Sequence, residues 1–307
     1  MSSKTLFHYT TFEGLKGILE ENCFRATDAY TTNDSQEIVH GIDLIKHYLK
    51  KNGENEVIKE KVSKEKVIKE KVKGFIDYLI GKERSDKLAR GVFLTCFSSY
   101  DDADPDKVFN NGLLSQWRGY GFKQGYALKF DSDLLLKDFE SESREKDAVH
   151  TSGDVTYCNM EDFLDKEDNK KSFDEINKSI RQLETNPSGF SGSREEQELF
   201  ESILKICFHN KHKGFCEERE YRVVKATWEN KESIKKYDVF FYEGCGGLVR
   251  SYVKILKGKP RMALKEIIVG PSPNKERNKI QIESFLKQIG SEIPSDVKVE
   301  ISATPFV

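Results

Sequence analysis

Short apolar runs rich in aromatic and β-branched residues recur along the whole of this chain, and they limit the folds open to it. Runs of this kind, bounded by glycine, proline or polar clusters, are typical of β-strands. They are Leu6–Tyr9, Phe24–Thr27, Gly91–Phe97, Gly125–Phe130, Gly214–Val224, Val239–Tyr242, Tyr252–Leu256, Leu264–Val269 and Val297–Ile301. Because helical patterns separate many of them, the sequence predicts an α+β protein with a central, mostly antiparallel sheet that can be split.

The domain organisation follows from length and composition. The 307 residues can bury one large core, and no break in composition divides them. We therefore expect a single domain, residues 1–307, with helical insertions at 36–90 and 132–212. The first insertion carries a duplication, Val57–Val62 recurring as Val67–Val72, which is typical of a lengthened helix with a solvated, charged face.

The overall charge and the cysteines bear on partners and location. The 50 Lys and Arg residues nearly balance the 52 Asp and Glu residues, and the net charge of -2 gives no strong field for nucleic acid or an acidic membrane. The six cysteines are dispersed without a Cys-x-x-Cys spacing, which favours free thiols in a reducing compartment. With neither a signal-peptide core nor a membrane-spanning apolar stretch, we expect a cytoplasmic protein without membrane attachment.

The run Gly214–Val224 carries charged residues, which are costly to bury within an apolar strand. If it is a strand with a period of two, Glu218, Glu220 and Arg222 share one face. A carboxylate beside a cation keeps its charge at neutral pH, and it can accept a hydrogen bond from a substrate hydroxyl or stabilise a developing positive centre. The alternative is an edge strand protected by charges and a structural salt bridge.

His8 and Tyr9 end the first predicted strand, directly before a helix capped by Thr10 or Thr11. Backbone N–H groups at a helix N-terminus favour anions, so a phosphate-bearing ligand would fit there. The alternative is a satisfied core histidine and a packing tyrosine.

A second specific stretch, Leu113–Gly121, predicts a short helix that ends in glycines and presents Gln116, Trp117 and Arg118 beside the next strand. The arginine fork suits a pyrophosphate, and the indole offers a stacking face. A packing pair of Trp117 with Arg118 is the alternative.

Two groups of residues raise the question of a metal ion. The loop Asp101–Asp106 is rich in aspartate but lacks calcium-loop spacing with a closing Glu, so a solvated loop is favoured. His209 and His212 lie three residues apart, yet nothing nearby completes a set of metal ligands. We therefore expect no metal.

Several of these motifs follow one another in a familiar order. They are Phe7–Thr10, Gly14-Leu15 with Ile18-Leu19, Asn33–Glu37, Leu114–Gly121, Phe215 with Glu218–Arg222, and Ile267–Pro271. Their order resembles a widespread bacterial family of domains of unknown function, number 2971, over nearly the whole chain. The duplication and much of 135–210 look like length variation outside the resemblance.

The same order also resembles the three-part pattern of ADP-ribosyltransferases, which implies an ADP-ribosyltransferase-like fold and NAD as substrate. By this resemblance His8 binds a ribose, Tyr9 or Tyr120 stacks on nicotinamide, and Ser98 supports the pocket. Glu220 is then the catalytic carboxylate, and Glu218 orients the acceptor. The remaining residues expected to bind NAD are Thr10, Gln116 and the two candidates for the pyrophosphate, Arg118 and Arg222.

Three functions agree with these patterns. The first is an NAD-dependent ADP-ribosyltransferase-like enzyme, a toxin or antiviral defence effector that modifies nucleic acid or protein. A carboxylate near the 2-hydroxyl would stabilise the oxocarbenium character that develops as the nicotinamide bond breaks. The second is a nucleotide- or ligand-sensing module of a defence system without turnover. The third is a metal-dependent nuclease that uses Glu218, Glu220 and the aspartate loop with magnesium.

Overall fold

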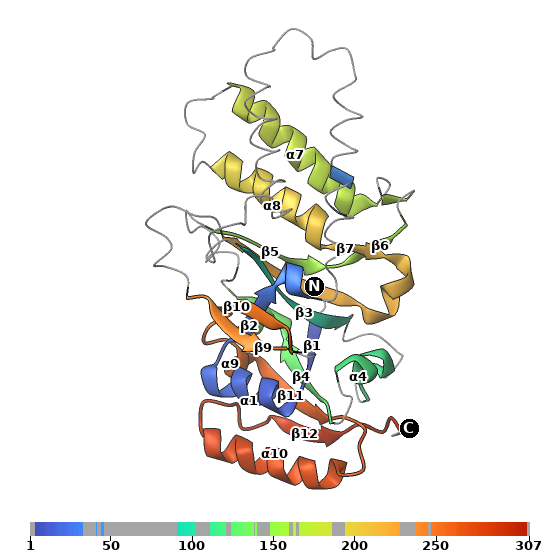
Figure 1. Cartoon of the computed structure of the whole chain (residues 1–307), viewed down its shortest axis with the longest axis vertical. Coiled ribbons are helices and arrows are strands. Elements are labelled where there is room, and N and C mark those ends of the chain that lie inside the picture. Colours follow the sequence, from blue (N-terminus) through green and yellow to red (C-terminus); the bar gives the residue numbers. More distant parts are fainter. Residues whose placement is uncertain are drawn as a thin grey trace.

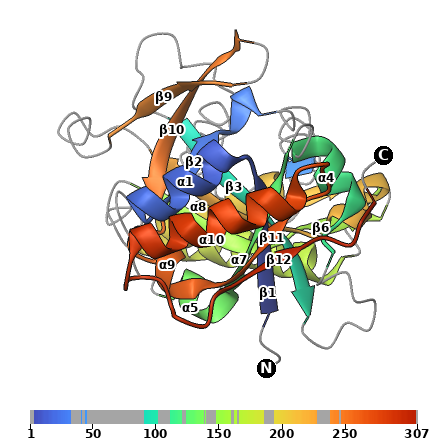
Figure 2. The same ribbon diagram turned by 90° about the horizontal axis from the view of Figure 1, so that it is seen from below.

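The computed structural model describes residues 4–32, 41, 44–45, 91–101, 111–120, 124–137, 139, 148–159, 162–163, 166–185, 194–227, 238–244 and 247–305, with the backbone alone at 101, 120 and 180–185. These residues form three layers with a sheet in the middle (Figure 1). Helices α7 (Glu167–Thr185) and α8 (Arg194–Phe208) lie over one face of the sheet. Helices α1 (Phe12–Glu21) and α10 (Lys275–Ile289) lie side by side over the other face (Figure 2).

The main sheet contains ten of the described strands in the order β12-β11-β4-β1-β3-β2-β10-β9, with β8 paired to β3 and β5 paired to β8. Its strands are β1 Lys4–Thr10, β2 Phe24–Asp28, β3 Gly91–Asp101, β4 Tyr126–Asp131, β5 Ala148–Asp154, β8 Glu220–Thr227, β9 Phe240–Glu243, β10 Val249–Ile255, β11 Leu264–Val269 and β12 Lys298–Ile301. Only β11 and β12 pair in parallel in this sheet, so the predicted mixed fold with a large, mostly antiparallel sheet is confirmed.

Strand β3 is the branch point of the sheet. One of its edges pairs with β1 over Ser98–Asp101 and with β2 at Phe93 and Leu94, while its other edge pairs with β8 from Gly91 to Ser98. Strands β1 and β2 therefore separate along the same edge of β3, and the region between them is where the sheet divides.

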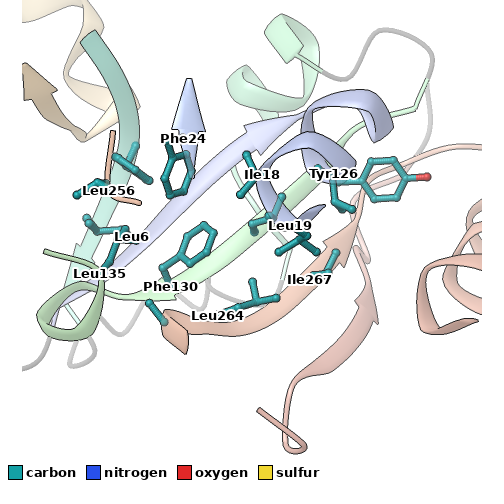
Figure 3. Close-up of a cluster of buried hydrophobic side chains, with 14 of the residues drawn as sticks. Leu6, Ile18, Leu19, Phe24, Tyr126, Phe130, Leu135, Leu256, Leu264 and Ile267 are labelled. Atoms are coloured by element: carbon teal, nitrogen blue, oxygen red, sulfur yellow. The ribbon is translucent and has the colours of Figure 1, made fainter. Parts of the chain in front are cut away.

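Alternation along the strands sorts the core onto the two faces. Val224 and Ala226 of β8 pack with α8 in one cluster, which we call the α8 core. Val223 packs in a second cluster, beneath α1 and α10, which we call the α1 core. Figure 3 shows side chains of the α1 core. Helix α1 contributes Leu15, Ile18 and Leu19 to the α1 core at helical spacing. Thr11 is its N-cap, because its Oγ1 accepts a hydrogen bond from the N–H of Gly14 at 3.3 Å.

The range 132–212 is not purely helical. It contains α5 (Ser132–Leu136), α7 and α8, but it also supplies β5 to the main sheet. A second, two-stranded sheet pairs β6 (Thr156–Cys158) with β7 (Asn210–His212). Of the expected insertion 36–90, only residues 41, 44 and 45 are described, so the duplication at 57–72 lies outside the described residues.

The run Gly214–Val224 is not one strand, and this corrects the sequence-based interpretation. Residues Lys213–Glu218 form a 3-10 helix, η7, and Arg219 takes a left-handed conformation with φ 45° before β8 begins at Glu220. Glu218 therefore does not share a strand face with Glu220 and Arg222. The turn at Arg219 is stabilised by its backbone, whose carbonyl accepts a hydrogen bond from the N–H of Ser99 at 2.6 Å.

Candidate functional site

The charged residues at the start of β8 lie on the α8 face of the sheet. Glu220 and Arg222 have the same parity as Val224, which packs in the α8 core. Ser98 of β3 is the cross-strand partner of Glu220 and also of Phe7 on β1. Since directly paired residues share a face, Phe7, Ser98 and Glu220 form one row across three strands.

Four charged side chains form a compact ionic cluster at this row. Arg222 donates to Glu220 Oε2 from Nε at 3.0 Å and from Nη2 at 2.6 Å. Lys211 donates from Nζ to Glu218 Oε2 at 2.6 Å and lies 3.7 Å from Glu220 Oε2. Two cations thus face two carboxylates, which offsets the cost of removing these charges from water.

Arg222 is 1% exposed, and the C-terminal end of a neighbouring helix helps to stabilise its buried charge. Its Nη1 donates to the carbonyl oxygen of Phe208, the last residue of α8, at 2.9 Å. The last carbonyls of a helix lack partners within the helix and carry partial negative charge, so a guanidinium is favoured at this position. Arg222 therefore links β8 to α8.

The two carboxylate oxygens of Glu220 have different surroundings. Oε2 takes both hydrogen bonds from Arg222, whereas Oε1 accepts no hydrogen bond from the residues that the structure describes. The backbone N–H of Glu220 donates to Tyr157 Oη at 2.7 Å. Burial, followed by the nearby carboxylates, raises the pKa of Tyr157 well above its ordinary value, so this phenol stays protonated.

Helix α4 (Leu114–Tyr120) lies on the same face, next to β1. Tyr9 packs edge-on against Trp117 at 5.0 Å between ring centroids, and its Oη accepts a hydrogen bond from the N–H of Leu113 at 2.8 Å. Burial raises the pKa of Tyr9 above its ordinary value. Helix α4 also contacts η7, which ends at Glu218, so Gln116 and the exposed Arg118 belong to this part of the molecule.

His8 and Thr10 point the other way, so His8, the residue expected to bind a ribose, does not lie on the face that carries Glu220. On β1 they alternate with Phe7 and Tyr9, which places them on the α1 face. The imidazole of His8 packs against Phe24 and Phe97, and its Nδ1 donates to the carbonyl oxygen of Cys96 at 3.0 Å. Burial lowers the pKa of His8 to about 4, so the ring is neutral at physiological pH.

The structure therefore joins some of the expected residues and separates others. Tyr9, Ser98, Glu220 and Arg222 lie on one face, with α4 and its Gln116 and Arg118 beside them. His8 and Thr10 lie on the opposite face, and the side chain of Tyr120 is outside the described residues. Arg222 is corrected from a pyrophosphate ligand to a structural group, because its guanidinium is buried against Glu220 and Phe208.

Sequence reasoning did not identify Lys211, Tyr157 or the role of His209. His209 is buried beside the cluster, where Nε2 lies 3.0 Å from Thr151 Oγ1 and Nδ1 donates to the carbonyl oxygen of Gly153. Burial, with a smaller contribution from the charge of Arg222, lowers its pKa to about 3. The only sequence signal for these residues was that Asn210 and Lys211 come soon after the apolar residues at the end of α8. The structure shows that both are buried.

Two features that would indicate other classes of function are absent from the described residues. Among the described residues, no group of three or more His, Cys, Asp or Glu side chains is arranged to hold a metal ion. Residues 102–106 of the aspartate loop lie outside the described part of the chain, so the nuclease stays a prediction. No helix in the described ranges is both long and apolar enough to cross a membrane.

Comparison with known proteins matches part of the chain to a family. Residues 116–223 match a family described as a protein of unknown function (DUF2971). The matched range runs from α4 into β8 and includes Gln116, Arg118, Glu218, Glu220 and Arg222, which supports the resemblance to that family over this part of the chain. No curated protein and no solved structure matches the chain.

Proposed function

We propose that this protein is an NAD-dependent ADP-ribosyltransferase-like enzyme whose reacting carboxylate is Glu220. One observation carries the proposal: Oε2 of Glu220 is held by Arg222, while Oε1 accepts no hydrogen bond from the described residues. A carboxylate with one oxygen anchored and the other open is already oriented for a substrate hydroxyl. Such preorganisation is effective because no reorganisation is needed during the reaction.

The chemistry assigned to Glu220 is electrostatic. The bond between C1 of the ribose and the nicotinamide nitrogen breaks, and nicotinamide leaves with the bonding pair. C1 then carries oxocarbenium character, which Glu220 stabilises through a hydrogen bond from the 2-hydroxyl. An acceptor oxygen adds to C1 and its proton passes to solvent. One hydrogen bond that strengthens in the transition state contributes about 3 to 4 kcal/mol, or roughly a hundred- to thousandfold in rate.

The other residues take roles that fit their positions. Arg118 is exposed on α4 and is the candidate for the pyrophosphate. Arg222 and Lys211 are positioning residues, because they act on substrate only through the carboxylates that they hold. Glu218, with 22% of its side chain exposed, is placed to orient an acceptor. His8, which lies on the opposite face of the sheet, has no role in the proposed reaction.

The test is transfer of label from NAD. Purified protein is incubated with NAD labelled in its adenylate phosphate and a bacterial lysate, and the label is followed into protein and into nucleic acid. Glu220→Gln should slow the transfer about a hundredfold or more. Glu217→Gln is the matched control, because Glu217 is an exposed carboxylate of η7 only three residues away, and it should keep the wild-type rate.

Two results would reject the enzymatic proposal. One is equal transfer by Glu220→Gln and Glu217→Gln, with thermal unfolding used to verify that both variants fold. The other is calorimetric binding of NAD by the wild type without product after long incubation, which would favour the ligand-sensing module. The fraction that takes up the label, protein or nucleic acid, identifies the acceptor class of the proposed toxin or defence effector.

A further inference from the structure

Asn111, just before α4, connects two distant segments of the chain. Its carbonyl oxygen accepts hydrogen bonds from Trp117 Nε1 at 2.8 Å and from Ser302 Oγ at 2.6 Å, with Thr304 Oγ1 at 3.4 Å. Its side-chain Oδ1 accepts from the N–H of Ala303 at 3.0 Å. Ser302 is fully buried, and its own N–H donates to the carbonyl of Val269 at 2.9 Å. The segment Ser302–Thr304 is therefore fixed to β11 and holds Asn111 in turn.

Trp117 carries this attachment into α4. Its ring is 5% exposed and packs against Tyr9 of β1. Gly112, with φ 70°, lies directly beneath the indole, since a Cβ there would come within 2.6 Å of Trp117. Gly270 also lies close to the indole, because a Cβ there would stand 2.8 Å from the same ring. These contacts meet at Asn111 and Trp117, and they fix the start of α4 against β1 and the segment Ser302–Thr304.

We propose that Asn111 and the segment Ser302–Thr304 form a positioning bracket that holds α4 beside the Glu220 face and thereby sets the affinity for NAD. This inference rests on the proposed function, because it assigns binding to α4 and bond cleavage to β8. Helix α4 carries Gln116 and Arg118 and contacts η7, whereas Glu220 is held by Arg222 of β8 and lies next to Lys211 of β7. Loosening the bracket should therefore weaken NAD binding and leave the chemical step intact.

The test uses the full chain with Ser302→Ala combined with Thr304→Val, which removes little volume. It removes two hydroxyl donors to Asn111 and the hydrogen bond that Ser302 Oγ accepts from the N–H of Thr304. The matched control is Ser284→Ala, which removes an exposed hydroxyl of α10 that donates a hydrogen bond to the carbonyl of Ile280. Amide hydrogen exchange of 114–120 should be faster in the double variant and unchanged in the control. The KM for NAD should rise about tenfold at unchanged kcat, as expected for the loss of the two hydroxyl hydrogen bonds to Asn111.

Unchanged exchange at 114–120 in the double variant would overturn the bracket, whatever the activity. A fall in kcat at constant KM would overturn it as well, because the damage would then reach the chemical step. If the wild type transfers no label, the proposed function is refuted on its own, and exchange at α4 alone decides whether the bracket positions the helix.

Discussion

Replacing Arg222 by methionine should cost more stability than replacing any exposed arginine. Met keeps much of the apolar volume but removes the charge, so Glu220 loses hydrogen bonds of 3.0 and 2.6 Å and the carbonyl of Phe208 loses its 2.9 Å donor. At 1% exposure water cannot replace these partners. Removing one partner of a buried ion pair costs about 3 to 5 kcal/mol, partly because the remaining charge is left without compensation.

Urea unfolding followed by circular dichroism measures this loss, with a shift of the midpoint at constant slope as the sign of a change in stability. Arg194→Met is the control: Arg194 also pairs with a glutamate, Glu198, at 2.8 Å, but its side chain is 84% exposed. Exposed pairs of this spacing contribute about 0.3 to 0.5 kcal/mol. A loss below about 1 kcal/mol for Arg222→Met would refute the reasoning, since it would show that water reaches the pair.

A double-mutant cycle separates the pair from the rest of the cluster. Adding Glu220→Gln to Arg222→Met removes the uncompensated carboxylate, so the two losses should be less than additive by about 0.5 to 3 kcal/mol. Strict additivity would mean that the two groups do not interact in solution.

Two further predictions concern pH and packing. Burial lowers the pKa of His209 to about 3 from an ordinary value of 6.5, so between these values the unfolded chain binds a proton that the folded chain does not. The stability present above pH 6.5 is therefore lost as the pH falls through this window. His209→Gln should make the free energy of unfolding in urea depend less steeply on pH between pH 6 and 5, by about 1.4 kcal/mol per pH unit. An equal slope in both proteins would contradict the burial of a neutral imidazole. Gly270→Ala should destabilise by about 1 to 3 kcal/mol, because its Cβ would lie 2.8 Å from both the carbonyl oxygen of Gly125 and the ring of Trp117. Gly119→Ala in α4, where a Cβ meets nothing within 4 Å, should instead stabilise the folded protein by up to about 1 kcal/mol. If Gly119→Ala were less stable than Gly270→Ala, the packing around Trp117 would differ from the one described here.

Much of the local structure follows from the sequence. The apolar runs Leu6–Tyr9, Tyr252–Leu256 and Leu264–Val269 predict strands, and the structure has β1, β10 and β11 at these positions, because short runs of aromatic and β-branched residues favour an extended backbone. The prediction was wrong at Gly214–Arg219, where apolar and charged residues allow a strand. Arg219 turns into the left-handed region instead, and this depends on its contact with Ser99, a residue distant in sequence.

The candidate site also depends partly on the local sequence and partly on the tertiary structure. The sequence by itself determined that Glu220 and Arg222 share a face and that His8 and Tyr9 do not, because a strand has a period of two. Only the tertiary structure decided which of these residues meet, through the pairing of Ser98 with Phe7 on one side and with Glu220 on the other. A slip of one residue between β1 and β3 would bring His8 to the face of Glu220 and remove Tyr9 from it, and this register is set by packing on both sides of the sheet, which no single stretch of sequence contains.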